Sequence, residues 1–494
     1  MSEVSLQDID GILKRSHQAF LIYQKVTGKD KASFLEAIAL EIESIGDTLI
    51  KTAMEETNLP EARLAGERGR TCNQLRQFAA LVKEGSWVEA RIDTAIPDRA
   101  PLPKPDLRKM MVPLGPVVVF GASNFPFAYS TAGVDTASAL AAGCPVVLKA
   151  HPAHPRTSDL VAHAIAKAAG RTGMPADIFI HVHAAGFETG KALVQHPLTK
   201  AVGFTGSFSG GKALYDYATQ RPEPIPVFSE MGSINPVFIL PGSMQARSEK
   251  VAEMYAASIT QSVGQFCTNP GLLLSMENNH LEEFKRQLAD KMKKVAPATM
   301  LHPGIAGNFL KNRQHALAQK GVTLLAESSE RPGQNQGMAT LATVKAADFI
   351  SNPALVEEVF GPYSLLVTAS NITELKAAAE RIPGQLTTTI IGEEDELIRY
   401  ADFIQLVTAK AGRVIINGVP TGVEVCPSMH HGGPFPATTD SRFTSVGTDA
   451  IKRFVRPVSF QNFPQALLPV ELRNENAYGI WRLLNNSWTR DKVS

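Results

Sequence analysis

The chain has 494 residues, of which 44% are hydrophobic and 20% charged, a balance typical of a globular protein. Lys and Arg number 49 and Asp and Glu number 48, which argues against nucleic acid or an anionic membrane surface as the main partner. No apolar run approaches the roughly 20 residues of a membrane span, and acidic residues interrupt the N-terminal segment where a signal peptide needs its apolar core. We expect a cytoplasmic protein with more than one domain.

The cysteines and histidines indicate neither disulfides nor a metal site. The four cysteines form no CxxC pair and no zinc-type spacing: Cys72, Cys144, Cys267 and Cys426. So few cysteines in so long a chain favour a reducing compartment. Several histidines stand close together in the sequence, but no carboxylates or cysteines accompany them at ligand spacing, so we expect no metal. These are His151, His154, His181, His183, His430 and His431.

The N-terminal part is predicted to be helical. Residues 5–90 carry helical patterns, and the segment 35–56 places apolar residues at intervals of three and four, as an amphipathic helix does. The proline-rich stretch 97–105 follows, which predicts a connector or an exposed edge.

From residue 112 onward, strands and helices alternate. The first block has a β-branched run within 112–126, and then a helix, a strand, a helix and two strands at 131–143, 144–150, 158–173, 177–185 and 200–207. A second alternating block runs from 226 to 420, with strands at 271–276, 363–370 and 386–392 and helices at 280–295 and 372–382. Such alternation predicts βαβ units, mainly parallel sheets and two α/β domains with a cleft between them. A late strand is predicted within 450–464.

Several polar residues directly follow these predicted strands, where α/β proteins collect their functional groups. They are Asn124, Lys149, Gly206 with Ser207, and Glu230; Cys267 lies in a turn-prone stretch after a helix-like run. Taken singly, each fits an ordinary role: a turn residue, a solvated charge, a glycine-rich turn, a loop acid and a small buried residue.

The order of these residues is more specific than any one of them. The segments are FGASNFPF (120–127), PVVLKA (145–150), FTGSFSGG (204–211), SEMGSINPVFI (229–239), GQFCTNP (264–270) and EEVFGP (357–362). In this order they resemble the aldehyde dehydrogenase superfamily, and the resemblance runs from about residue 110 to 430. AHPAHP after the lysine, Met-Gly-Ser after Glu230 and HHGGPFPATTDSRFTSVG at 430–447 depart from the common pattern. These departures resemble the branch with 2,5-dioxovalerate (α-ketoglutarate semialdehyde) dehydrogenases and an NADP-dependent fatty aldehyde dehydrogenase.

The resemblance implies an α/β, aldehyde dehydrogenase-like fold with three parts. A Rossmann-type cofactor domain would comprise 1–96 and 114–228, and an α/β catalytic domain would comprise 229–435. A small β oligomerisation element with a C-terminal tail would comprise 97–113 and 436–494, which implies a homodimer or homotetramer.

The resemblance also implies roles for the catalytic residues. Cys267 would attack an aldehyde carbonyl and form a thiohemiacetal. The side-chain amide of Asn124 would stabilise the oxyanion. After hydride transfer, Glu230 would activate water to hydrolyse the thioester.

The cofactor residues implied are Lys149 at the adenosine ribose, Gly206 and Ser207 near the pyrophosphate, and Glu358 with Phe360 at the nicotinamide ribose. NAD and NADP are both expected, with a slight lean to NADP, because Pro152 stands where many NAD-preferring relatives have a glutamate that repels a 2′-phosphate. Lys149 and Arg156 would leave that neighbourhood neutral to positive.

The expected reaction is oxidation of α-ketoglutarate semialdehyde to α-ketoglutarate. A dicarboxylic substrate of this kind needs a cation for its far carboxylate; Arg442 and the His430–His431 pair lie in the stretch that should border the substrate tunnel. A medium- or long-chain fatty aldehyde is the alternative substrate. Two alternative functions of other classes remain open. One is a cofactor-independent acyltransferase or hydrolase that uses Cys267, and the other is a non-catalytic protein that kept the fold.

Overall fold

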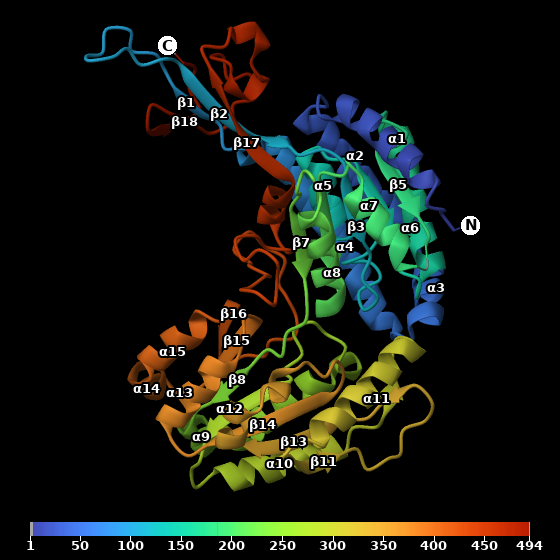
Figure 1. Ribbon diagram of the computed structural model, residues 1–494, viewed down its shortest axis with the longest axis vertical. Helices are drawn as coiled ribbons and strands as arrows, with labels where there is room; N and C mark the ends of the chain where they lie inside the picture. Colours follow the sequence, from blue (N-terminus) through green and yellow to red (C-terminus); the bar gives the residue numbers. More distant parts are fainter. Residues whose placement is uncertain (1–2, 185, 494) are drawn as a thin grey trace.

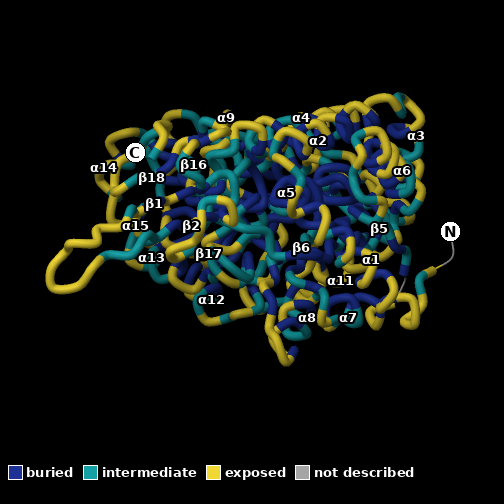
Figure 2. The backbone as a smooth tube through the Cα atoms, turned by 90° about the horizontal axis from the view of Figure 1, so that it is seen from above, coloured by how far each residue is buried: buried dark blue, intermediate teal, exposed yellow. Residues whose placement is uncertain are grey.

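The computed structural model describes residues 3–184 and 186–493, and it consists of two α/β lobes and a projecting β element (Figure 1). Residue 185, the last of the strand predicted at 177–185, and residues 1, 2 and 494 lie outside the described part. Buried residues run through the middle of the molecule, and α5 (Val134–Ala142) is buried along its whole length (Figure 2). Within the described ranges, no helix is both long enough and apolar enough to cross a membrane.

The first lobe is built on a five-stranded parallel sheet with the order β5-β4-β3-β6-β7. Its strands are short β-branched or aromatic runs, most of them buried, as expected of a parallel sheet covered on both faces. They are β3 (Val117–Phe120), β4 (Val146–Lys149), β5 (Phe179–Val182), β6 (Ala201–Thr205) and β7 (Val227–Glu230). The predicted strands 144–150 and 200–207 are thereby confirmed.

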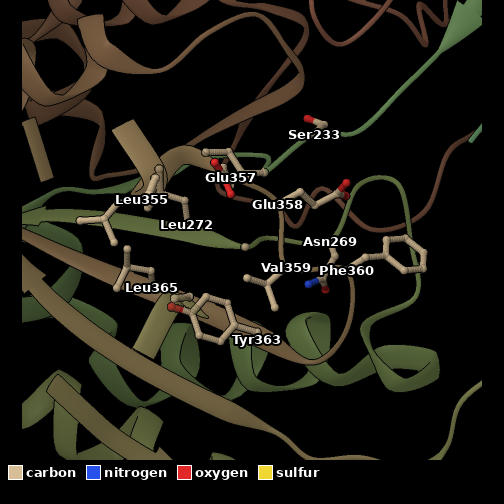
Figure 3. A pocket seen from close by; sticks show the side chains of 14 residues that line it. Ser233, Asn269, Leu272, Leu355, Glu357, Glu358, Val359, Phe360, Tyr363 and Leu365 are labelled. Atoms are coloured by element: carbon tan, nitrogen blue, oxygen red, sulfur yellow. The ribbon is translucent and has the colours of Figure 1, made fainter. Parts of the chain in front are cut away.

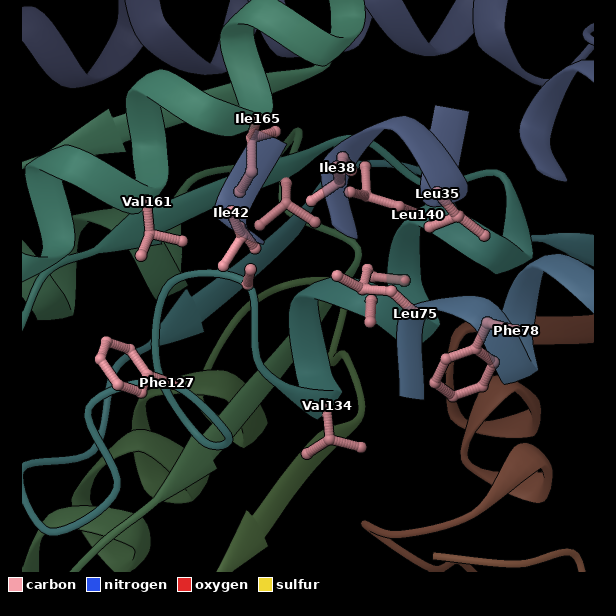
Figure 4. Packing of buried hydrophobic residues seen from close by; sticks show 14 of the residues in the cluster. Leu35, Ile38, Ile42, Leu75, Phe78, Phe127, Val134, Leu140, Val161 and Ile165 are labelled. Carbon is pink, nitrogen blue, oxygen red and sulfur yellow. The ribbon is translucent and has the colours of Figure 1, made fainter. Parts of the chain in front are cut away.

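Eight helices of the described chain belong to this lobe. They are α1 (Asp8–Tyr23), α2 (Gly28–Ser44), α3 (Asp47–Thr57), α4 (Glu61–Glu84), α5, α6 (Pro155–Thr172), α7 (Phe187–Gln195) and α8 (Phe208–Thr219). Ile38, Leu75, Leu140 and Ile165, from α2, α4, α5 and α6, pack in one buried cluster (Figure 4). This packing fixes α4, which carries charged residues of the site described below.

The second lobe has a seven-stranded sheet with the order β11-β13-β14-β9-β8-β15-β16, parallel except for β11. Its strands are β8 (Val237–Ile239), β9 (Leu272–Met276), β11 (Thr323–Glu327), β13 (Thr340–Lys345), β14 (Tyr363–Ala369), β15 (Gln385–Ile391) and β16 (Ala411–Ile416). Its helices are α9 (Pro241–Thr260), α10 (Leu281–Lys293), α11 (Pro303–Leu317), α12 (Ala346–Ser351), α13 (Ile372–Arg381), α14 (Glu394–Arg399) and α15 (Ala401–Thr408). A two-stranded ribbon joins β10 (Ala298–Thr299) and β12 (Gln336–Gly337).

The third sheet has the order β17-β2-β1-β18-β19 and projects from the first lobe (Figure 1). Its strands are β1 (Arg91–Asp93), β2 (Leu107–Pro113), β17 (Val455–Gln461), β18 (Arg482–Leu484) and β19 (Ser487–Thr489). The proline-rich stretch forms the exposed loop between β1 and β2. The late strand predicted within 450–464 begins only at Val455, because 448–454 forms a 3₁₀-helix whose apolar residues Ala450, Ile451 and Phe454 pack into the main core.

The chain returns from the second lobe to the first after β16. Thr438 forms an isolated β-bridge with Glu230, and the N–H of Met231 donates to the carbonyl of Ala437 (2.8 Å). The segment 430–447 therefore lies against the end of β7. The division into two α/β domains and a β element remains a proposal, which the three separate sheets support.

Candidate active site

Five of the predicted site residues come from the carboxyl edge of the first sheet. Lys149 is the last residue of β4, and Asn124 lies in the loop after β3. Gly206 follows β6 and donates its N–H to the carbonyl of Glu230 (3.0 Å), the last residue of β7. Ser207 caps α8, where its hydroxyl accepts from the N–H of Gly210 (3.2 Å). The topology thus aligns these residues along one edge, as the sequence predicted.

Cys267 lies in a strained loop of the second lobe, between α9 and β9. Ser262 and Val263 have φ of 47° and 58°, and a β-branched residue rarely adopts such a conformation. A Cβ on Gly264 would lie 2.2 Å from the carbonyl carbon of Gly361, so only glycine lets the two loops meet. The side-chain amide of Asn235 donates to the carbonyl of Cys267 (2.9 Å) and holds the loop in place.

The fold brings Cys267 and Glu230 to one histidine that sequence reasoning did not assign to the centre. Sγ of Cys267 lies 3.8 Å from Nε2 of His431, and Nδ1 of His431 lies 2.8 Å from Oε2 of Glu230. The hydroxyl of Ser445 donates to the same Oε2 (2.6 Å). Glu230 and His431 each retain 3% exposure, and Oε1 of Glu230 has no hydrogen-bond partner in the described ranges. The thiol of Cys267, the imidazole of His431 and the carboxylate of Glu230 thus form a continuous series of contacts.

The pKa shifts of Cys267 and Glu230 fit a thiol that needs a base. Burial, reinforced by the nearby Glu230 carboxylate, raises the pKa of Cys267 well above its ordinary value. Burial also works to raise the pKa of Glu230, but His431 and the hydrogen bonds from His431 and Ser445 outweigh it, so this pKa is lowered. Glu230 is therefore ionised at neutral pH, whereas Cys267 is protonated until a neighbour accepts its proton.

Asn124 borders the cysteine loop from the first lobe. Its side-chain amide donates to the carbonyl of Gln265 (3.3 Å), two residues before Cys267. The guanidinium of Arg63 donates to the backbone carbonyl of Asn124 (2.9 Å) and stacks over the ring of Phe266 at 4.8 Å. Asn124 is thus close to Cys267, as predicted.

Arg63 is one of two arginines that α4 places beside this centre, and sequence reasoning missed both. Arg70 donates to the hydroxyl of Tyr129 (3.3 Å), and its charge acts to lower the pKa of Cys267 against the effect of burial. NH1 of Arg63 and Nε of Arg70 are buried without a hydrogen-bond partner in the described part of the chain. Glu67, between them on the helix, accepts the N–H groups of Phe127 and Ala128 and lies 3.7 Å from Arg63.

Arg442, by contrast, does not border the site. Its side chain is 79% exposed and pairs with Asp440. Of the C-terminal residues considered for a cation near the substrate, Arg442 thus lies in solvent, whereas His431 lies beside Cys267. Arg63 and Arg70 add two cations from α4.

Glu358 and Phe360 line a pocket of the second lobe next to the cysteine loop (Figure 3). Ser233 and Asn269 line the same pocket, and burial raises the pKa of Glu358 to about 7 while the backbone N–H of Ser233 acts in the opposite direction. A Cβ on Gly232 would lie 2.5 Å from a carboxylate oxygen of Glu358, so this glycine lets the segment after β7 approach the carboxylate closely. Glu358 is near enough to Cys267 to act on its pKa, which connects this pocket with the thiol.

His431 and Ser445 have a signal in the sequence that could have found them. Both lie within HHGGPFPATTDSRFTSVG, the segment that departs most from the common family pattern. A departure beside a predicted nucleophile indicates altered chemistry there, but the 201 residues between Glu230 and His431 hide their contact from any local pattern.

Comparisons with known proteins identify the family of this chain. The family model described as "Aldehyde dehydrogenase family" matches residues 1–447. An alpha-ketoglutaric semialdehyde dehydrogenase of Acinetobacter baylyi is 46% identical over 99% of this chain and 93% of its own length. A second protein of that name, from Azospirillum brasilense, is 48% identical over 96% of this chain and 91% of its own length.

Solved structures show the same fold at low sequence identity. Apo betaine aldehyde dehydrogenase of Staphylococcus aureus is 19% identical, with a TM-score of 0.79 over 95% of this chain and 90% of its own. Glyceraldehyde-3-phosphate dehydrogenase GapN of Methanocaldococcus jannaschii, complexed with NADP, is 18% identical, with a TM-score of 0.77 over 93% of this chain and 95% of its own. The solved structures show the shared fold, and the family model with the two relatives at 46% and 48% identity establishes that the chain belongs to the aldehyde dehydrogenase family, whose members oxidise small-molecule aldehydes with NAD or NADP.

Proposed function

We propose that this protein oxidises α-ketoglutarate semialdehyde to α-ketoglutarate with NAD or NADP. The observation that supports this type of reaction is the series of contacts from Cys267 through His431 to Glu230. The names of the two relatives at 46% and 48% identity support the substrate. The alternative of a fatty aldehyde is less compatible with two arginines beside the cysteine.

The first step is the attack of Cys267 on the aldehyde carbonyl. The thiol is a weak nucleophile here because burial raises its pKa, so a base must accept its proton. Glu230 accepts the Nδ1–H of His431, which leaves the Nε2 lone pair directed to Sγ at 3.8 Å. His431 is therefore the base of this step, and Glu230 holds it in the correct tautomer.

The oxyanion that forms on the substrate needs fixed donors. The amide of Asn124 and the backbone N–H of Cys267 are the groups proposed, and one such donor typically contributes about 10²–10³ in rate. Asn124 is held through its own carbonyl by Arg63, so the amide is positioned before substrate arrives.

The residues proposed for the cofactor fit a dinucleotide. Lys149 and Ser207 border the carboxyl edge of the first sheet, and the N-terminus of α8 favours a phosphate. Glu358 and Phe360 line the pocket next to Cys267, where Gly232 leaves room for the carboxylate. When bound, NAD or NADP supplies the hydride acceptor.

The last step is hydrolysis of the Cys267 thioester. The expectation was that Glu230 alone activates water. One of its oxygens is engaged by His431 and Ser445, while Oε1 is free of partners in the described ranges. We therefore assign water activation to the Glu230–His431 pair acting together.

Arg63 and Arg70 are proposed to bind the carboxylate of the substrate. Both lie on α4 beside Cys267, and each keeps a buried N–H group without a partner in the described chain. Hydrogen bonds to charged groups contribute about 1.5–3 kcal/mol, so a carboxylate that satisfies these donors would be favoured over an alkyl chain.

A preference for NADP remains a proposal that rests on one feature. Pro152 provides no carboxylate to repel a 2′-phosphate. The expected help from Arg156 is absent, because Arg156 pairs with Glu55 and Glu56, so its charge is balanced. The support for NADP is therefore the lack of repulsion, together with Lys149.

A homodimer or homotetramer is proposed from the third sheet. Large apolar side chains stay exposed on and around it, including Leu102 (69%), Leu467 (69%) and Trp488 (61%). β17 and β19 are edge strands, and an edge of this kind is normally covered.

The role of His431 predicts a specific loss. In His431→Gln, kcat/KM at pH 7 should fall about 100-fold, because general-base catalysis typically contributes 10²–10⁴. The loss should shrink as the pH rises, since the thiol then ionises without help. His430→Gln, which removes the neighbouring imidazole, is the control; an equal loss in both variants would contradict the assignment.

The substrate proposal predicts a preference among aldehydes. Measured as kcat/KM by reduced-cofactor absorbance, α-ketoglutarate semialdehyde should exceed decanal. Arg63→Met and Arg70→Met should each raise KM for the semialdehyde about 10–100-fold, the equivalent of one lost charged hydrogen bond, and should change KM for decanal far less. Because Arg63 also holds Asn124 and Arg70 acts on the pKa of Cys267, any fall in kcat should be similar for the two aldehydes. Arg76→Met, on the exposed side of α4, is the matched control.

Two results of the same assays would count against this proposal. They are a preference for decanal in the wild-type protein, or turnover without any cofactor, as the acyltransferase or hydrolase alternative requires. Running each assay with NAD and with NADP gives the cofactor preference. A tenfold higher kcat/KM with NAD would refute the proposed slight preference for NADP.

The oligomer proposal predicts a dimeric or tetrameric mass in light scattering at micromolar concentration. Trp488→Glu should weaken the assembly, because it places a charge on the exposed apolar face of β19. A monomeric mass for the wild-type protein would contradict the proposal.

A further inference from the structure

A cluster of two histidines and one aspartate lies in the first lobe, apart from the active site. His181 is in β5 and His183 follows it, so the period of two places both side chains on the face covered by α6. Asp159 comes from α6. The potential ligand atoms of these three residues all lie within 4.8 Å of one another.

The arrangement leaves one ligand atom unused. Oδ1 of Asp159 lies 2.7 Å from Nε2 of His183 and 3.5 Å from Nδ1 of His181. The side chain of His181 is only 8% exposed, and its Nδ1 has no hydrogen-bond partner among residues 3–184 and 186–493. A buried imidazole nitrogen directed at a carboxylate without a hydrogen bond calls for an explanation.

The surroundings of His181 fix its ring in the orientation that a metal ligand needs. Its Nε2 lies 2.7 Å from the hydroxyl of Ser158, which lies 2.6 Å from the hydroxyl of Thr131. When Ser158 donates to Thr131 it accepts the Nε2–H of His181, and the lone pair of Nδ1 then faces Asp159. Metal-binding histidines typically use their second nitrogen in this way.

We propose that Asp159, His181 and His183 form a binding site for a first-row divalent cation of the zinc type. Two imidazoles and a carboxylate are ligands that such cations accept. Tetrahedral zinc with bonds of about 2.0–2.1 Å separates its ligand atoms by roughly 3.3 Å. The distance of 3.5 Å is close to this value, and the distance of 2.7 Å needs to widen by about 0.6 Å as the cation replaces the proton between Asp159 and His183.

The position of the site gives it a structural consequence. The cation would connect α6 to β5, the edge strand of the first sheet. Val182, between the two histidines, pairs with Lys149, so the site lies one strand away from the lysine proposed for the cofactor. Sequence spacing did not reveal the cluster, because Asp159 precedes the histidines by more than twenty residues.

The test must exclude the active site, because Glu230, Cys267 and His431 also bring three potential ligand atoms within 4.8 Å. Calorimetric titrations with Zn²⁺ are therefore run on the full-length Cys267→Ala protein without cofactor. We expect one equivalent of Zn²⁺ to bind and to raise the melting temperature, and Co²⁺ to bind with visible d–d absorption. Mg²⁺, which prefers oxygen ligands, should not bind there.

Variants of the cluster locate the binding. Asp159→Asn and His183→Gln, added separately to Cys267→Ala, should each weaken Zn²⁺ binding at least tenfold and remove the cobalt absorption. His280→Gln, which removes an exposed imidazole of the second lobe, should leave both unchanged. Absence of Zn²⁺ binding in the Cys267→Ala protein, or equal affinity in that protein and both cluster variants, would overturn the proposal.

Discussion

The hydrogen bond between Oε2 of Glu230 and Nδ1 of His431, 2.8 Å long and almost fully buried, is the interaction on which the proposed chemistry depends. It joins the end of the first sheet to the segment that returns from the second lobe. Without it, the imidazole would lose both its fixed tautomer and its position 3.8 Å from Cys267. A buried carboxylate left without this partner would also be costly, so loss of His431 should destabilise the fold as well as the site.

The two lobes contribute different residues to the proposed site. The carboxyl edge of the parallel sheet provides Asn124, Lys149, Ser207 and Glu230, because parallel strands all end on the same side. The second lobe provides Cys267 on a strained loop that glycine allows to pack against its neighbour. The groups that we propose to react therefore meet only when both lobes are folded and joined by the segment 430–447.

Much of this fold could be predicted from the sequence. Short β-branched runs alternating with amphipathic stretches predicted the parallel sheet, and strands such as Val146–Lys149 lie where expected. Cys267, Glu230 and Asn124 could be predicted as site residues because each stands in a recognisable segment, and the structure brings them close together. The late strand was predicted too long, since the local pattern of 450–454 does not reveal that its apolar residues turn into the core as a 3₁₀-helix.

The residues that the sequence did not reveal share one physical cause. His431 reaches Glu230 across 201 residues, and Arg63 reaches Asn124 across 61 residues, so their roles arise from tertiary packing and not from a local period. Asp159 reaches His183 in the same way, through the packing of α6 on β5. The function of a charged or aromatic residue on a predicted helix cannot be inferred until the fold shows which distant residues it contacts.

In the proposed mechanism, Cys267 forms a thioester whose hydrolysis depends on Glu230. The most direct measurement is the mass of the peptide that contains Cys267, after Glu230→Gln is mixed with cofactor and α-ketoglutarate semialdehyde and quenched rapidly. An acyl adduct on Cys267 should accumulate together with at most one reduced cofactor per site. The amide oxygen introduced by the substitution can still accept the Nδ1–H of His431 for the attack of Cys267, whereas an amide cannot activate the water that releases the acid. Steady turnover with an unmodified Cys267 would contradict this mechanism.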